Sequence, residues 1–484
     1  MKHLVKLLFA LVPITCGSEI IAQESSTGKP HLAQAEIIAN TRFIQIPGPN
    51  PILKESGPEA WDEKSCETAG VLKDGYTYYL YYHAIGQGHG YRTGVATASH
   101  PLGPWKKYEK NPIIPGPCAK ILKESHNKYY AWYQNGESPR GEINLASASH
   151  PLGPWVPYEK NPILKNVGYV SGVVKVKGTY FLYHEAGDIF LATAQKPEGP
   201  WEKYSGPAVD SPASRALEDE VKITENPVLK GDIGDWDSSC YFPGGGYSEG
   251  SVLYHDGVFH LFYTGSQTCP TQAARLESIG YAFSFDGYNF IKHPKNPIGP
   301  REKNPDASSF SEVQVLFQPP FYYAYHTLRY ESKGGWLGLT GDKTGYKGRS
   351  IEDIGVQIFA TERQFRLSMP LMNIDILPAA SASSLKDCPP LCLEQIKDLA
   401  VTVKCRYDKG ASAGLRVHIR ASCDGLAYDT EDLYVFDLPC RAAETVSKTV
   451  ELQPKVMFIK VIVENLDSSH NITDVKVTAT LGSS

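Results

Sequence analysis

The sequence predicts an all-β protein with two domains, a five-bladed β-propeller followed by an antiparallel β-sandwich. Three observations predict this class: a motif that recurs five times, hairpins of alternating aromatic residues inside the repeats, and a change of pattern after the last repeat. The composition agrees, because 43 Gly and 35 Pro supply many turns and 29 Tyr favour strands. No long segment has helical periodicity.

The recurring motif is Asn-Pro followed by Ile or Val. Its copies begin at Asn50, Asn111, Asn161, Asn226 and Asn296, which are 61, 50, 65 and 70 residues apart. Two copies follow the near-identical segments SHPLGPWKKYEK and SHPLGPWVPYEK. Repeats of this length that hold three or four strands are typical of propeller blades, and five blades close a circle. An open array of β-sandwiches is the alternative.

Inside each repeat, an apolar strand, a turn and an aromatic strand follow one another in the same order. Two examples of the turn and the aromatic strand are KDGYTYYLYYH at 73–83 and HDGVFHLFYT at 255–264. Asp-Gly between β-rich runs is a hairpin signal. We expect the propeller to span residues 35–360. Residues 365–484 read as five or six alternating strands with polar turns, which predicts the sandwich.

The first 23 residues have the pattern of a secretory signal peptide. Lys2 and Lys6 precede the short apolar run 7–14, and small and polar residues follow. We expect a secreted or periplasmic protein, with lipoprotein anchoring through Cys16 as the alternative. Export permits disulfides, which we expect among the nine remaining cysteines, with at least one thiol left over.

The charge balance argues against two classes of partner. The chain has 48 Lys and Arg against 53 Asp and Glu, a net charge of −5. Nucleic-acid binding and polybasic membrane attachment both need clustered positive charge. No run in the mature part reaches the ~18 apolar residues of a membrane-spanning helix. We therefore expect neither a nucleic-acid partner nor a membrane span, while the oligomeric state stays open.

Three carboxylates fall on the apolar strands that open the repeats. Glu67 and Glu249 share one repeat position in the sequence, and Glu312 lies within one residue of it. Carboxylates on apolar strands cost desolvation free energy unless they have a partner or a task. Paired carboxylates are the groups that hydrolyse a glycosidic bond by acid–base catalysis. We therefore expect these residues in the catalytic site, with a purely structural role as the alternative.

Two Trp-Asp pairs precede two of these strands. They are Trp61-Asp62 and Trp236-Asp237. An indole beside a carboxylate suits sugar binding, because the ring stacks on the sugar face while an oxygen contacts a hydroxyl or a water. We expect Asp62 to be catalytic, and Trp61, Trp236 and Asp237 to bind substrate. A packing Trp with a capping Asp is the alternative.

Three histidines directly follow an aromatic strand and share one repeat position in the sequence. They are His83, His184 and His326. We expect them to donate hydrogen bonds to substrate hydroxyls, or else to be satisfied locally as polar strand ends. The sequence identifies no cofactor and no set of metal ligands, and it leaves open a divalent cation in the central channel.

Taken together, these motifs resemble the five-bladed glycoside hydrolases. The NPIL opening, the Trp-Asp pairs, the DGxYYLYY hairpin and the SHPLGPW segments are similar to families 43, 32 and 117 and to the family 130 phosphorylases, over residues 40–350. Family 43 would imply an Asp base on blade one, an Asp modulator on blade two and a Glu acid on blade three. Asp62 matches the base, whereas blade two has Cys118 and blade three has Ser171.

The predicted function is that of a secreted, exo-acting glycoside hydrolase with a carbohydrate substrate. Asp62 is assigned as the base and Glu249 as the acid, with Glu67 and Glu312 as modulators or sugar-binding groups. The alternatives are a non-catalytic glycan-binding propeller and a glycoside phosphorylase. The identity of the sugar stays open.

Overall fold

The computed structural model describes residues 28–483 apart from 58, 87–88, 136–140, 206–226, 240–243, 268–276, 300–310, 330–351, 362–364, 395 and 454. The predicted signal peptide and Cys16 lie outside the described residues. The predicted all-β class is confirmed, since strands dominate the described part and one helix, α1 (Gly28–Ala39), accompanies them. That helix was not expected, because its three turns are too few for periodicity to stand out. No helix in the described ranges is long and apolar enough to cross a membrane.

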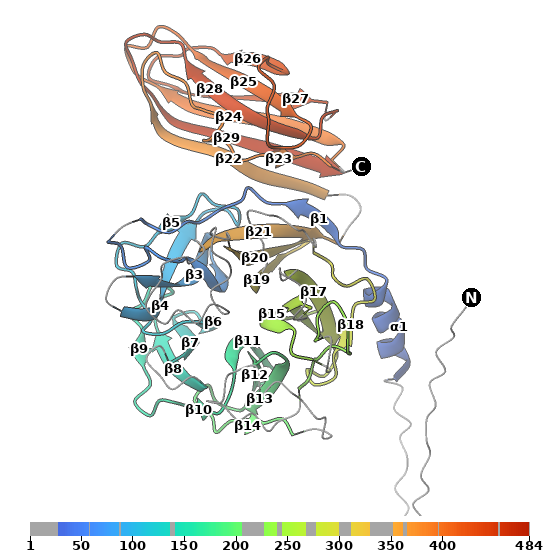
Figure 1. Cartoon of the computed structure of the whole chain (residues 1–484). Coiled ribbons are helices and arrows are strands. Elements are labelled where there is room, and N and C mark those ends of the chain that lie inside the picture. The colour runs from blue at the N-terminus through green and yellow to red at the C-terminus, as the bar shows by residue number, and fades with distance from the viewer. Residues whose placement is uncertain are drawn as a thin grey trace, which may run out of the picture. The chain divides into compact units, whose positions relative to one another are not determined.

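Five antiparallel sheets follow one another between residues 44 and 360 (Figure 1). In the first four, neighbouring strands follow the sequence order, except that the last two strands of sheet two both pair with its third strand. Sheet one contains β2 (Glu67–Asp74), β3 (Thr77–Gly86), β4 (His89–Ala98) and β5 (Lys106–Lys107), and sheet two contains β6 (Lys120–Ser125), β7 (Lys128–Gln134), β8 (Glu142–Ala148), β9 (Val156–Pro157) and β10 (Leu164–Lys165). Sheet three contains β11 (Tyr169–Val176), β12 (Thr179–Glu185), β13 (Ile189–Ala194) and β14 (Glu202–Lys203), and sheet four contains β15 (Tyr247–His255), β16 (Val258–Ser266), β17 (Glu277–Ser284) and β18 (Ile291–Lys292).

Sheet five joins the two ends of this region. Its strands β19 (Ser311–Gln318), β20 (Phe321–Arg329) and β21 (Glu352–Ala360) are followed in the sheet by β1 (Ile44–Pro47), which pairs antiparallel with β21. Ile46 of β1 lies opposite Ile358, and both side chains are buried. The first described strand therefore completes a sheet whose other strands lie about three hundred residues later in the sequence.

The repeated Asn has the same structural role in four sheets. Its side-chain amide donates to the carbonyl of one residue in the third strand and accepts from the N–H of that same residue, as a neighbouring strand would. Asn111 contacts Val95 of sheet one in this way, at 2.9 Å in both directions. The other three pairs are Asn161 with Leu145, Asn296 with Tyr281, and Asn50 with Val356. Asn226 lies outside the described residues.

The first strands of the five sheets contact one another in a closed order. β2 contacts β6, β6 contacts β11, β11 contacts β15, β15 contacts β19, and β19 contacts β2 again. Figure 1 shows the labelled β6, β11, β15 and β19 around a common centre. Aromatic side chains of the second strands tie neighbouring sheets together. The hydroxyl of Tyr81 donates to the Pro151 carbonyl at 2.9 Å, and that of Tyr325 donates to the Pro101 carbonyl at 2.7 Å.

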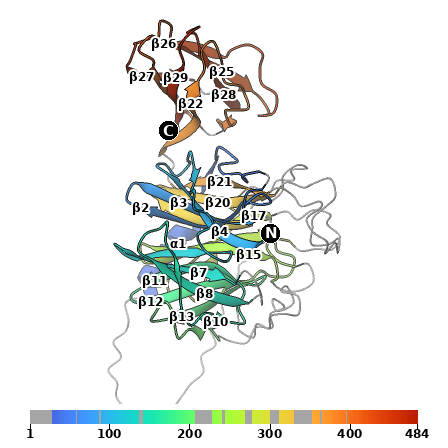
Figure 2. The ribbon, with the colours of Figure 1, turned by 90° about the vertical axis from the view of Figure 1, so that its left-hand side faces the viewer.

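Two further sheets form the C-terminal part. Sheet six contains β22 (Phe365–Leu377), β29 (Ile472–Ser483), β24 (Asp398–Tyr407) and β27 (Thr445–Leu452), and sheet seven contains β23 (Leu391–Cys392), β28 (Phe458–Asn465), β25 (Leu415–Ser422) and β26 (Tyr434–Leu438). Alternate residues of these strands, such as Val401, Val417 and Val461, are buried in one apolar core. Figure 2 shows the strands of the two sheets from the side.

The cysteines do not form the expected disulfides within the described part of the chain. All seven described cysteines are free thiols, and Cys66, Cys118, Cys388 and Cys405 are buried. Free cysteine packs as a small apolar side chain, which accounts for the place of Cys66, Cys388 and Cys405 in an apolar core. Cys240 and Cys269 lie outside the described residues.

Candidate active site

Seven buried side chains, which we call the central cluster, gather where the first strands meet. All five sheets contribute: Glu67 and His83 from sheet one, Lys120 from sheet two with Cys118 just before it, Glu185 from sheet three, Glu249 from sheet four and Glu312 from sheet five. Three of the predicted catalytic residues, Glu67, Glu249 and Glu312, belong to it. Sequence reasoning did not single out Lys120 or Glu185.

Glu249 is the best-anchored carboxylate of the cluster. The Cys118 thiol donates to its Oε1 at 2.8 Å, and the Lys120 ammonium donates to its Oε2 at 2.8 Å. Lys120 also donates to the carbonyl of Ala69 at 2.7 Å. Lys120 and Glu249 are 4% and 5% exposed, so this ion pair is buried. A charged lysine at this depth needs a carboxylate partner, and the ion pair makes Glu249 the negatively charged member.

Glu185 has the opposite character. Burial, with a smaller contribution from the negative charge of Glu249, raises the pKa of its carboxyl from an ordinary value of 4.5 to about 8, although the N–H of Gly187 donates to it. Glu185 is therefore protonated at neutral pH and can act as an acid. The sequence signal was present, because this acidic residue directly follows His184 at the end of an apolar strand.

Glu67, His83 and Glu312 form a second group within the cluster. Their ligand-type atoms all lie within 4.8 Å of one another. His83 Nε2 is 3.3 Å from Glu67 Oε2. Burial disfavours the charged imidazole, but the charge and hydrogen bond of Glu67 outweigh it and raise the pKa of His83. Thr327 donates to Glu312 Oε2 at 2.6 Å and so fixes that carboxylate.

The strand register corrects the predicted equivalence of the glutamates. Glu67 is a regular partner of His83, whereas Glu249 is the extra residue of a β-bulge between Ser248 and Gly250. Glu312 also lies in a bulge, with a positive φ of 59°. The two glutamates do not share one repeat position, since bulges re-aim side chains and a sequence alignment does not detect them.

The three histidines do not share one position either. The tyrosine that reaches the neighbouring sheet marks equivalent positions, and it is Tyr81 in sheet one and Tyr325 in sheet five. His83 is two residues after this tyrosine, whereas His326 is one residue after it. Successive strand residues face opposite sides, so the two imidazoles point in opposite directions. The prediction was wrong because a second tyrosine, Tyr82, stands between Tyr81 and His83 in the first repeat. A comparison that counts from the end of the aromatic run is therefore off by one residue.

His184 and His326 lie in buried, apolar surroundings. His184 also follows the marker tyrosine of its sheet, Tyr183, by one residue. Its Nδ1 accepts from the Gly168 N–H at 3.1 Å, and its ring stacks on Phe190 at 5.4 Å. Burial lowers the pKa of His184 to about 3 and that of His326 to about 4. Both imidazoles are therefore neutral at physiological pH.

Asp62 is held within the first sheet and its preceding loop. It is fully buried, and its Oδ2 contacts Lys107 Nζ at 2.5 Å, Ser56 Oγ at 3.1 Å and the Tyr82 hydroxyl at 3.2 Å. Lys107 belongs to β5, the last strand in the order of sheet one, and none of these partners is a member of the central cluster. Trp61 packs against Tyr82, with ring centroids 5.4 Å apart.

Asp237 repeats this arrangement in sheet four. Its Oδ2 contacts Lys292 of β18 at 2.7 Å and the Tyr263 hydroxyl at 3.0 Å. Trp236 stacks on Tyr263 with ring centroids 6.0 Å apart. The two Trp-Asp pairs are therefore equivalent structural units, in which a buried aspartate joins the loop before the first strand to the outermost strand of the same sheet.

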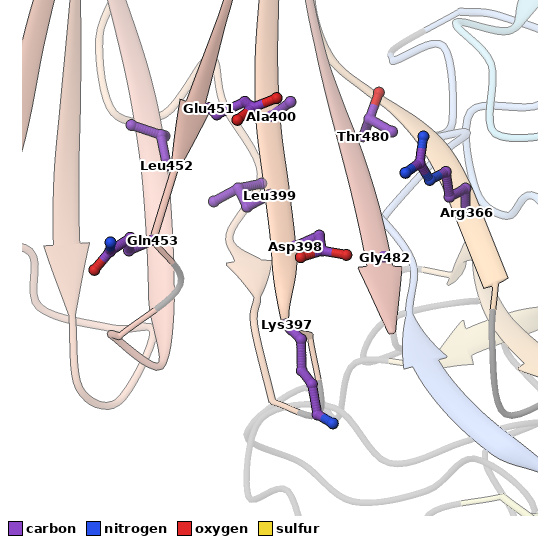
Figure 3. A pocket seen from close by; sticks show the side chains of 10 residues that line it. All are labelled: Arg366, Lys397, Asp398, Leu399, Ala400, Glu451, Leu452, Gln453, Thr480 and Gly482. Atoms are coloured by element: carbon purple, nitrogen blue, oxygen red, sulfur yellow. The ribbon is translucent and has the colours of Figure 1, made fainter. Parts of the chain in front are cut away.

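A separate cavity of about 570 Å³ lies on sheet six (Figure 3). Charged side chains of both signs line it, including Arg366, Asp398 and Glu451. No aromatic side chain is among its lining residues, so it lacks the flat apolar surface on which a sugar ring stacks.

No protein-family model matches the chain, and no curated protein matches it. Among solved structures, a glycosyl hydrolase from Bacteroides ovatus is 16% identical, covers 65% of this chain and 93% of its own, and has a TM-score of 0.44. A second structure comes from the GH130 family of mannoside phosphorylases, which is described as containing glycoside hydrolases that target β-1,2 mannosidic linkages in Candida mannan. It is 16% identical, covers 66% of this chain and 93% of its own, and has a TM-score of 0.45.

A thermostable family-43 glycoside hydrolase is also 16% identical, with coverages of 63% and 91% and a TM-score of 0.38. Families 43 and 130 are both named by the resemblance drawn from the sequence, which is confirmed as a resemblance. Identities and TM-scores this low do not make the chain a member of either family.

Proposed function

We propose that the chain is a glycoside hydrolase in which Glu185 is the general acid and Glu249 is the ionised carboxylate that acts as base or nucleophile. The observation that carries this proposal is the contrast between the two groups. Burial keeps Glu185 protonated with a pKa of about 8, while Lys120 pairs with the charged Glu249. Cleavage of a glycosidic bond needs one carboxyl group in each of these two states.

The proposal includes a propeller architecture for residues 44–360 and a sandwich for residues 365–483. The closed order of first-strand contacts supports the propeller, and the shared apolar core of sheets six and seven supports the sandwich. A propeller brings residues of all its blades to one axis, which agrees with the contribution of all five sheets to the central cluster.

The assignment of roles differs from the one that the sequence suggested. There Glu249 was the acid and Asp62 the base. The ion pair with Lys120 favours a charged role for Glu249, and sheet three supplies Glu185 as the acid where Ser171 had seemed to leave none. We propose that Asp62 positions the loop of sheet one. Export and exo-action are also part of the proposal, and they rest on residues 1–23 and on the sequence resemblance.

Kinetics on a panel of aryl-glycosides and of marine and plant oligosaccharides tests the proposal. We expect Glu185→Gln and Glu249→Gln to lower kcat by about 10²-fold to 10⁴-fold, the usual contribution of acid–base catalysis. Glu185→Gln should lose least on substrates with a dinitrophenyl leaving group, because that group departs without a proton. The exposed Glu202→Gln is the matched control and should keep wild-type kcat.

Two outcomes would replace the proposal by the alternatives. Glycan affinity without any product across the panel would indicate a binding protein. Turnover that depends on added inorganic phosphate would indicate a phosphorylase.

We further propose that Glu67, His83 and Glu312 hold a divalent cation. Two carboxylates and one imidazole within 4.8 Å are a suitable donor set for a hard cation such as Ca²⁺ or Mn²⁺. A bound cation would supply positive charge that neutralises the crowded carboxylates. At a Ca²⁺ concentration of 100 Kd, linkage predicts about 2.7 kcal/mol of added stability. Thermal unfolding with Ca²⁺ and with EDTA measures this gain, which Glu67→Gln should reduce.

A further inference from the structure

The contacts of Glu249 point to a function for two residues at the start of strand β6. Cys118 and Lys120 are separated by one residue, and each donates to a different oxygen of the same carboxylate, both at 2.8 Å. Two donors on two oxygens fix the position of a carboxylate and also the plane of its three atoms. A single donor would leave rotation about the side-chain bonds.

The contact reaches across the centre of the five-sheet ring. Lys120 belongs to sheet two and Cys118 to the segment just before it, while Glu249 belongs to sheet four, with β11 of sheet three packed between β6 and β15. Lys120 also donates to the Ala69 carbonyl in sheet one at 2.7 Å. The position of Glu249 is therefore coupled to sheets one and two besides its own, and a displacement of either would move the carboxylate.

The backbone at Cys118 adds an independent observation. Its φ is 57°, in the left-handed region that a residue with a Cβ adopts at a cost. Glycine would occupy this conformation without strain, yet the chain has a cysteine whose thiol points at Glu249.

We propose that Cys118 and Lys120 are positioning residues that hold Glu249 in the orientation its catalytic role needs. The inference rests on the proposed function of Glu249 and extends it to two residues that act through this carboxylate. A catalytic group that is misplaced by about 1 Å slows the chemical step, while the substrate still binds. The expected signature is a fall in kcat at nearly constant KM.

The test compares Cys118→Ala, Cys118→Ser and Lys120→Met with the wild-type enzyme. We expect Cys118→Ala and Lys120→Met to lower kcat by about 10-fold to 100-fold with little change in KM. Cys118→Ser keeps a donor and should recover most of the loss. Two matched controls should keep wild-type kcat. Cys388→Ser alters a buried thiol of the C-terminal part. Lys123→Met removes a lysine that lies in β6, as Lys120 does, and pairs with Asp74 at the surface.

A double-mutant cycle measured by thermal unfolding tests the contact between Cys118 and Glu249 without any substrate. The sum of the Tm losses in the two single variants, Cys118→Ala and Glu249→Gln, should exceed the Tm loss of the double variant. If Lys120→Met does not fold, the Cys118 variants decide the question. Wild-type kcat in Cys118→Ala together with additive Tm losses would overturn the positioning role alone. A wild-type protein without turnover on any glycan would overturn the proposed function, and the positioning role with it.

Discussion

At the scale of single residues, the neighbours of each carboxyl group decide what it can do. Glu249 and Glu185 are the same amino acid in the same cluster. Lys120 stabilises the charged form of Glu249, whereas burial favours the neutral form of Glu185. The chemistry we propose depends on this difference, since an acid and a charged carboxylate are both required.

The raised pKa of Glu185 predicts a pH-dependent loss of stability. Between pH 4.5 and about 8 the folded protein binds this proton and the unfolded chain does not. The free energy of unfolding therefore falls as pH rises through this range, by at most about 1.4 kcal/mol per pH unit from this group. Glu185→Gln has no proton to lose and should escape this fall. Urea denaturation of both proteins at several pH values measures the difference.

Parallel stability curves for the two proteins from pH 5 to pH 8 would contradict the assignment of Glu185 as a neutral acid. The same residue predicts that kcat/KM of the wild-type enzyme falls as pH rises past about 8, because the acid of the free enzyme is then deprotonated.

At the scale of elements, the Trp-Asp loops join the beginning of a sheet to its end. Asp62 contacts Lys107 of β5, and Asp237 contacts Lys292 of β18. The short outer strands have two residues each, too few to be held by ladder hydrogen bonds alone. A buried ion pair with a tyrosine hydroxyl therefore helps to hold each of them on its sheet.

This equivalence predicts matching effects of Asp62→Asn and Asp237→Asn. Each should lower the free energy of unfolding by about 2–3 kcal/mol, less than for a fully buried pair because Lys107 and Lys292 are partly exposed. Both variants should keep kcat within a few fold of the wild type. Chemical denaturation and steady-state kinetics measure the two effects, and each variant is the control for the other.

Loss of turnover in Asp62→Asn alone, with stability unchanged, would instead support the base that the sequence analysis assigned.

At the scale of the whole molecule, the chain closes its ring of sheets with its own first strand. β1 adds to β21, and Asn50 then pairs with Val356 of the same strand. Ile46 is 3% exposed and lies opposite Ile358. Separating the ends would expose this apolar contact, so closure contributes to the stability of the five sheets together.

Closure predicts that Ile46→Ala destabilises the protein by about 2–5 kcal/mol, as for other large-to-small changes in a core. Ile291→Ala in the short strand β18 is the control, since that side chain is 47% exposed and should contribute less than about 0.5 kcal/mol. Thermal and chemical unfolding of both variants measures the comparison. Equal effects of the two substitutions would show that the closing strand contributes no more than a surface position.

The sequence by itself determined the all-β class and the repeat. Alternating aromatic residues and Asp-Gly turns are local signals, and local geometry decides strands and hairpins. It also identified Glu67, Glu249 and Glu312, because carboxylates on apolar strands are conspicuous without any structure. It identified His83 on the weaker ground of its place after an aromatic strand.

Only the tertiary structure decided which side chains meet and in what state. His184 and His326 directly follow the tyrosine that reaches the neighbouring sheet, whereas His83 comes two residues after its tyrosine, so the first two separated from His83. Lys120 and Glu185 joined the cluster from other sheets, because contacts between distant segments leave no mark in a local pattern. The proton on Glu185 is likewise a property of burial, which the folded chain creates and the sequence does not display.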